Sequence, residues 1–182
     1  MGQPKQLLEV AGQPMLLAVL EPLIACELVA SVFVVTNSLV ASSLDIAETD
    51  ASVVLNDDPD AEMIDSVRQG VTELQRRHEL TPDDGVLICP GDQPGLTTDD
   101  ITRCCQVYLQ SPTKITIASH GDKRGHPMIF PASMIPLVMS NACDAGLRAL
   151  PEAQAERVVT ATCAGPAVLR NVNTPDDYRR LG

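Results

Sequence analysis

Short apolar runs rich in β-branched residues alternate along this chain with segments of helical periodicity, and this alternation limits the fold more than any other feature. The strands predicted in this way are Ser31–Thr36, Ser52–Leu55, Val86–Cys89, Lys114–Ser119 and Met128–Phe130. The helices predicted between them and after them are Met15–Val29, Ser38–Glu48, Glu62–Arg77, Thr98–Leu109, Ala132–Met139 and Asp144–Leu150. The pattern predicts a three-layer α/β/α sandwich around a mostly parallel sheet.

Two segments depart from this alternation. Gly121–Phe130 and Arg157–Arg170 place strand-like runs next to each other with no helix between them, including a strand at Ala167–Arg170. We expect both segments to be antiparallel additions to one edge of the sheet. Pro175 is expected to open a terminal helix.

Composition and charge exclude several classes of protein. The 182 residues fit a single domain, 1–182, and the net charge of −11 with 2% aromatic residues does not fit a nucleic-acid-binding surface. No apolar run approaches the length that would span a membrane, and no signal pattern opens the chain, so a cytoplasmic protein is expected. The six cysteines include no Cys-x-x-Cys pair, which argues against a zinc or iron–sulfur site.

The segment Val86–Pro94 carries the clearest functional signal. A buried-strand pattern ends there in a Pro/Gly-rich turn that holds one carboxylate, Asp92. In α/β proteins ligands bind at the carboxyl ends of the strands, where a carboxylate can hold a divalent cation. The alternative is that Asp92 only forms the turn.

Four segments in this order resemble the MobA-like NTP transferases, and among them the molybdenum cofactor cytidylyltransferase branch. They are Met1–Leu8, Gly91–Pro94, Arg124–Pro127 and Asn171–Tyr178. The resemblance implies a Rossmann-like sandwich of the nucleotide-diphospho-sugar transferase type. It also implies transfer of a nucleotidyl group, CMP from CTP, to a phosphorylated pterin that carries molybdenum, with release of pyrophosphate and Mg²⁺ as the cation. A molybdoenzyme or its maturation chaperone is the expected recipient of the product.

The resemblance also assigns roles to residues. It implies that Lys5 contacts the NTP phosphates, that Gly91 and Gln93 flank the nucleotide beside Asp92, and that Asp92 and Asn173 ligate Mg²⁺. Asp92 and Lys5 are the expected catalytic residues. Many members of this branch have Asp where this chain has Asn171 and Asn173, so we expect a lower metal affinity here, since an amide oxygen brings no charge. Asn171 and Asn173 could instead be turn residues at a strand end, and Lys5 a solvated lysine.

Further residues are placed near the substrates by the same resemblance. Arg124 and His126 are expected near the acceptor, where the guanidinium could bind its phosphate. Asp144 and Arg148 match another segment near the acceptor. The resemblance places Ser66 and Arg68 near the nucleotide, but the pattern slightly favours the alternative that they are ordinary residues of an amphipathic helix. Glu62 stands where the family has Gly.

The family has a strand and a Gly-rich phosphate-binding turn immediately before the segment that matches Met1–Leu8. We therefore expect the chain to be truncated at its N-terminus relative to the family and to lack the first, central strand. A misassigned start and a member that has lost NTP binding are both compatible with this pattern. Two other functions stay open: transfer to a sugar phosphate or another phosphorylated metabolite, and a non-catalytic cofactor-binding protein.

Overall fold

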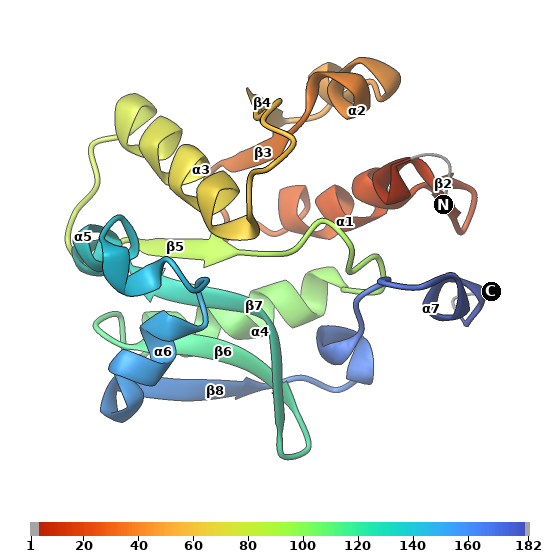
Figure 1. Ribbon diagram of the computed structural model, residues 1–182. Helices are drawn as coiled ribbons and strands as arrows, with labels where there is room; N and C mark the ends of the chain where they lie inside the picture. The colour runs from red at the N-terminus through yellow and green to blue at the C-terminus, as the bar shows by residue number, and fades with distance from the viewer. Residues whose placement is uncertain (1–3, 181–182) are drawn as a thin grey trace.

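The computed structural model describes residues 4–180, and it shows an α/β fold in three layers (Figure 1). In chain order its strands are β1 (Glu9–Val10), β2 (Gln13–Pro14), β3 (Val32–Thr36), β4 (Ala51–Leu55), β5 (Gly85–Ile88), β6 (Ile115–His120), β7 (Lys123–Pro131) and β8 (Val158–Thr162). Its α-helices are α1 (Met15–Ile24), α2 (Ser38–Ser43), α3 (Met63–Arg77), α4 (Thr98–Leu109), α5 (Ile135–Val138), α6 (Ala149–Ala153) and α7 (Pro175–Arg179). Short 3-10 helices are η1 (Lys5–Leu7), η2 (Ile46–Glu48), η3 (Ala132–Met134), η4 (Asn141–Cys143), η5 (Ala155–Arg157) and η6 (Pro166–Leu169).

The main sheet has the strand order β5-β7-β6-β8. Because β7 is antiparallel to both β5 and β6, while β8 is parallel to β6, the strands β5, β6 and β8 point the same way. A second, parallel pair is formed by β3 and β4, with Val34 opposite Val53. Within residues 4–180, β3 and β5 each pair along one edge only.

The antiparallel strand is not where the sequence pattern placed it. We expected Gly121–Phe130 at an edge, but β7 lies inside the sheet, because its residues 128–131 pair with β5 while Thr116 and Ile117 of β6 pair with its other edge. The expectation of antiparallel pairing for the segment from Arg157 is also wrong, since β8 pairs with β6 in parallel. The expected strand at Ala167–Arg170 is instead mostly the 3-10 helix η6.

Helices cover both faces of the main sheet, which confirms the sandwich. Phe130 and Met128 of β7 pack with Ile64 and Val67 of α3, together with α5 and α6, on one face. The intervening Ile129 faces the opposite side, where it packs with α1 and α4. In Figure 1, α6 lies in front of the main sheet and α4 behind it. The alternation of side chains along β7 thus divides the core into two layers.

Local sequence signals explain where the longer helices begin. The Thr97 hydroxyl accepts a hydrogen bond from the Asp100 backbone N–H, and the Asp100 carboxylate accepts one from the Thr97 N–H, so that α4 starts at a capping box. The helix α1 continues through Pro22, although proline lacks a backbone N–H, and ends at Ile24, five residues before the expected end.

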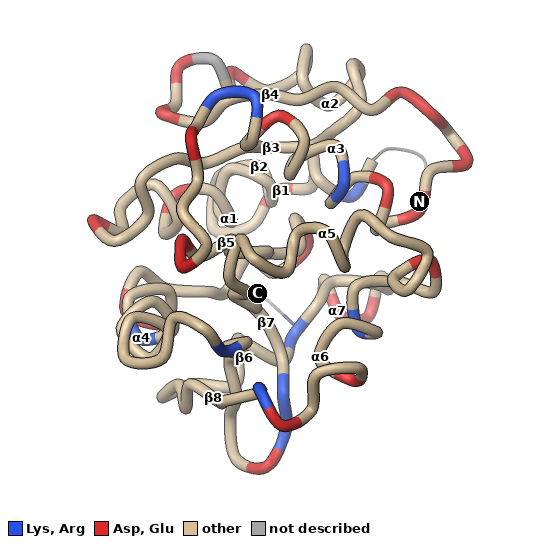
Figure 2. Tube along the Cα trace, turned by 90° about the vertical axis from the view of Figure 1, so that its left-hand side faces the viewer, with Lys and Arg blue, Asp and Glu red and all other residues tan. Residues whose placement is uncertain are grey.

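Acidic residues are spread over the trace rather than gathered on one element, and Figure 2 shows few basic segments between them. Among residues 4–180, no helix is both long and apolar enough to cross a lipid bilayer.

Candidate active site

Asp92 lies in the loop after β5, at the carboxyl end of that strand. The loop is held against the C-terminal part of the chain, because the Val172 backbone N–H donates to the Asp92 carbonyl oxygen at 2.9 Å. At Gly91 the loop passes close to α1, and a Cβ there would lie 3.3 Å from the Leu16 side chain. These contacts fix the backbone that carries the Asp92 carboxylate.

Lys5 connects the first segment of the chain to this loop. Its ammonium nitrogen Nζ lies 2.6 Å from Asp92 Oδ2 and 3.3 Å from Asn173 Oδ1. It also lies 3.4 Å from the Val172 carbonyl oxygen. Residues far apart in sequence therefore converge on one point, and the Lys5 ammonium contacts both Asp92 and Asn173.

Two further contacts hold this arrangement. Asn171 Nδ2 donates to Asp92 Oδ1 at 3.2 Å, so each carboxylate oxygen of Asp92 has a partner. The Asn173 backbone N–H donates to Asp177 in the capping box that starts α7. Hydrogen bonds from Thr174, and to a lesser degree from Asn173, lower the pKa of Asp177 and keep its carboxylate charged at the helix N-terminus.

The oxygens at this point suit a magnesium ion. A carboxylate oxygen, an amide oxygen and a backbone carbonyl oxygen all lie within 3.4 Å of one cationic group. Mg²⁺ takes oxygen ligands, and it uses only one or two carboxylates because it keeps several waters. The part of the chain that the structure describes holds no cluster of three His, Cys, Asp or Glu residues that could ligate a metal. We call Lys5, Asp92, Asn171, Val172 and Asn173 together the Asp92 group. Its oxygens suit a hydrated hard cation, and it lacks the nitrogen and sulfur ligands that zinc prefers.

A large pocket of about 660 Å³ adjoins the Asp92 group, because Gln93 and Asn171 belong to its wall. Its floor is apolar and comes from Ile117, Met128 and Val168. Two arginines, Arg124 of β7 and Arg148, also line it. The full lining is Met63, Gln93, Ile117, Arg124, Gly125, His126, Met128, Leu147, Arg148, Pro151, Glu152, Ala155, Val168, Leu169 and Asn171.

Two polar side chains in this wall have a buried atom whose hydrogen-bonding capacity the described residues leave unused. Gln93 is fully buried and donates from Nε2 to the Val168 carbonyl oxygen at 3.2 Å, while its Oε1 has no partner among residues 4–180. His126 Nδ1 also lacks a partner within that range. Burial lowers the pKa of His126, and the opposing effect of the Asp92 charge is smaller, which favours a neutral imidazole.

Gly125 is required by a close approach of two backbones. A Cβ at this position would overlap the Val168 carbonyl oxygen of η6. The Arg-Gly-His-Pro segment therefore packs directly on η6, and this contact helps to set the wall of the pocket.

The structure does not bring Ser66 and Arg68 into contact with the Asp92 group. The Arg68 guanidinium donates to the carbonyl oxygens of Val138 and Ser140 and forms an ion pair with Asp144 at 2.7 Å. Ser66 Oγ accepts from Asn56 Nδ2. Arg68 thus ties α3 to the segment around α5 and η4, and Asp144 is its partner.

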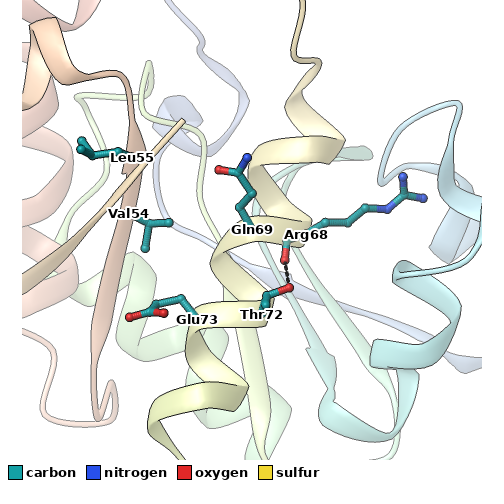
Figure 3. A pocket seen from close by; sticks show the side chains of 6 residues that line it. All are labelled: Val54, Leu55, Arg68, Gln69, Thr72 and Glu73. Atoms are coloured by element: carbon teal, nitrogen blue, oxygen red, sulfur yellow. Dashed lines mark hydrogen bonds between the residues drawn. The ribbon is translucent and has the colours of Figure 1, made fainter. Parts of the chain in front are cut away.

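A second, smaller hollow of about 320 Å³ lies between β4 and α3. Its walls come from Val54, Leu55, Arg68, Gln69, Thr72 and Glu73 (Figure 3). The Arg68 side chain points away from β4 in this view, and Thr72 Oγ1 donates to the Arg68 carbonyl oxygen. The hollow therefore presents little of the Arg68 charge.

Several lining residues were missed by the sequence analysis. Met63, Leu147 and Val168 contribute apolar surface to the large pocket. Apolar residues at helical or strand spacing predict core, and no sequence signal separates a pocket floor from a core. Cys89, next to the loop, offers no thiolate nucleophile, because burial, assisted by the Asp92 charge, raises its pKa to about 12.

The chain is similar to several proteins of known structure. Rv0371c from Mycobacterium tuberculosis H37Rv is 26% identical with a TM-score of 0.74, over 100% of this chain and 90% of that one. Its complex with manganese matches at 25% identity and a TM-score of 0.72, over 98% and 90%. A nucleotidyl transferase from Methanothermobacter thermautotrophicus shares the fold at 21% identity and a TM-score of 0.77, over 97% and 82%.

A more distant protein of the same fold is a CMP-2-keto-3-deoxy-manno-octonic acid synthetase solved with CTP. It is 16% identical with a TM-score of 0.71, over 97% of this chain and 89% of that one. No curated protein sequence gives a significant match. The model of the MobA-like NTP transferase domain matches residues 1–158, and the chain therefore belongs to this family.

Proposed function

We propose that this protein is a magnesium-dependent nucleotidyltransferase that moves CMP from CTP to a phosphorylated pterin, the molybdenum-bearing cofactor. The observation that carries the proposal is the convergence of Lys5, Asp92 and Asn173 at the edge of a pocket lined by two arginines. Family membership supports the reaction class, and the structural similarity to a protein solved with CTP supports the donor.

In this reaction a phosphate oxygen of the acceptor attacks the α-phosphorus of the nucleotide. The bond from that phosphorus to the oxygen bridging the α- and β-phosphates breaks, and pyrophosphate leaves with the electron pair. Asp92 and Asn173 would hold a bound magnesium ion, and that ion would neutralise charge on the phosphate oxygens. Lys5 supplies a further positive charge for the departing pyrophosphate.

The large pocket suits the acceptor. Arg124 and Arg148 can each bind an acceptor phosphate, since guanidinium groups bind phosphate with paired hydrogen bonds. The apolar floor favours a flat ring system, and Gln93 and His126 lie in the wall beside it. A pterin phosphate combines a flat heterocycle, ring N–H groups and an anionic end, which this wall can accommodate.

Two other proposals accompany this function. The product would pass to a molybdoenzyme or its maturation chaperone, and the protein would act in the cytoplasm. Both rest on the resemblance to the cytidylyltransferase branch. No nucleic-acid partner is proposed, because the net charge is −11.

A non-catalytic cofactor-binding protein is the second candidate, and one observation favours it. Lys5 forms an ion pair directly with Asp92, so a side chain of the protein occupies the point where a metal would bind. A sugar phosphate as the acceptor would keep the catalytic chemistry, and the arginines of the pocket would bind it equally well.

A transfer assay separates these candidates. CTP labelled at the α-phosphorus is incubated with Mg²⁺ and either the pterin phosphate or a sugar phosphate, and labelled product and pyrophosphate are measured together. We expect equal amounts of labelled pterin product and pyrophosphate. Label in the sugar product instead would identify a sugar phosphate as the acceptor. Binding of the pterin without turnover would identify a non-catalytic cofactor-binding protein.

A further inference from the structure

We propose that the Lys5 ammonium takes the place of the divalent cation while no nucleotide is bound, and that the cation enters only when Lys5 moves away. Binding of metal alone would therefore be weak. This inference rests on the proposed function, because it takes the Asp92 group as the metal-binding point.

The contacts of Lys5 are those of a cation in a small oxygen site. An ammonium group has three hydrogen-bond donors and no acceptor. Within residues 4–180, the Lys5 ammonium contacts Asp92 Oδ2 at 2.6 Å, Asn173 Oδ1 at 3.3 Å and the Val172 carbonyl oxygen at 3.4 Å. These carboxylate, amide and carbonyl oxygens are the types that hard divalent cations bind. Lys5 and such a cation would compete for the same oxygens.

The backbone that carries these oxygens is held in place, while the Lys5 side chain can move. The Asp92 carbonyl oxygen accepts a hydrogen bond from the Val172 N–H, and the Asn173 N–H donates one to the Asp177 carboxylate. Lys5 lies in η1, a three-residue helix without buried residues, and its side chain is 31% exposed against 14% for Asp92. A lysine stem has four flexible carbons, so a change of rotamer can withdraw the ammonium without moving the backbone.

The nucleotide offers Lys5 another partner. When a metal–nucleotide complex enters, the phosphates can accept the ammonium while the metal takes the oxygens that Lys5 leaves. Each exchange then favours the other, so metal and nucleotide should bind with positive coupling. Lys5 would thus prevent the site from loading with metal alone.

The test is a calorimetric titration of the metal-free protein with Mn²⁺ alone, without nucleotide. Lys5→Met should bind Mn²⁺ about tenfold more tightly than the wild type, within the usual range of coupling between sites. Lys5→Arg, which keeps the positive charge, should stay close to the wild type. Lys114→Met is the matched control, because Lys114 is an exposed lysine outside the Asp92 group. The Mn²⁺ affinity of this variant should equal that of the wild type.

A second titration, with the preformed Mg²⁺–CTP complex, should move in the opposite direction. Lys5→Met should bind this complex more weakly than the wild type, because the phosphates lose a cation. A general loss of structure would weaken both ligands and would not produce effects of opposite sign. Melting curves of the variants identify such a loss directly.

The outcomes separate this inference from the proposed function. If Lys5→Met leaves the Mn²⁺ affinity unchanged or lowers it while wild-type turnover is intact, the competition is disproved and the proposed function stands. The double variant Lys5→Met/Asp92→Asn should bind Mn²⁺ more weakly than Lys5→Met alone. If it does not, the metal is bound elsewhere and both proposals are wrong.

Discussion

Replacing Asp92 by asparagine tests the site with the smallest change of shape. The substitution removes the charge that pairs with Lys5 and that would bind the metal, but it keeps the size of the side chain. If Asp92 positions the cation, pyrophosphate release from CTP should fall by about 10²-fold or more, the scale of losing one main electrostatic stabiliser of a transition state.

The cost in stability should be far smaller. The Lys5 and Asp92 side chains are 31% and 14% exposed, and ion pairs with this access to water contribute about 1 kcal/mol or less. In a domain of this size, about 1 kcal/mol changes the melting temperature by roughly 2–4 °C. A large loss of activity with a small change of melting temperature is therefore the expected pattern.

The assay is coupled detection of pyrophosphate with CTP, Mg²⁺ and the acceptor, alongside a melting curve. Asp122→Asn is the control, because Asp122 is an exposed acidic residue between β6 and β7. Turnover of Asp92→Asn within a few-fold of the wild type would refute the role of Asp92, and a matching loss in Asp122→Asn would show that net charge alone explains the effect.

Three more predictions follow from named contacts. Asn173→Asp should bind Mn²⁺ more tightly than the wild type in a calorimetric titration, because a second carboxylate adds charge, and weaker binding would contradict its place at the metal. His126 has a pKa lowered by burial, so the unfolded chain binds its proton at higher pH than the folded one; the free energy of unfolding should fall as the pH drops below the ordinary value of 6.5, and urea titrations should show a weaker fall in His126→Asn. Gly125→Ala should lose about 1–3 kcal/mol in the same measurement, because its Cβ overlaps the Val168 carbonyl oxygen, and unchanged stability would show that the contact is loose.

Two helices with clear capping signals could be predicted closely. The helix α4 covers Thr98–Leu109 as expected, because the capping residues Thr97 and Asp100 and the apolar spacing act within one segment. The helix α3 begins within one residue of the prediction for the same reason. The α/β class followed from the alternation of these local patterns.

Pairing between distant segments could not be predicted in the same way. An apolar run such as Met128–Phe130 fits an edge or an interior strand equally well, and contacts with β5 and β6 place it inside. The run Ala167–Arg170 is apolar enough for a strand, but most of it forms the 3-10 helix η6, where the buried Val168 packs beside Gly125.

The site shows the same division. The position of Asp92 follows from the rule that ligand sites lie at the carboxyl ends of strands, since Asp92 comes after β5. Asn173 follows the 3-10 helix η6 instead of a strand, so its place beside Asp92 depends on the hydrogen bond between the Val172 N–H and the Asp92 carbonyl oxygen. The partners of Arg68 could not be deduced, because the sequence of α3 carries no information on the carbonyl oxygens of Val138 and Ser140 that it meets. The direct contact of Lys5 with Asp92 was also unforeseen, since it depends on how η1 docks on the loop after β5.

Anomalous diffraction from crystals grown with Mn²⁺ and a non-hydrolysable CTP analogue tests the central claim most directly. The account predicts one manganese peak bound by Asp92 and Asn173 and by the nucleotide phosphates, with the Lys5 ammonium moved from Asp92 to the phosphates. A nucleotide bound with manganese away from Asp92, or with Lys5 still paired to Asp92, would contradict it.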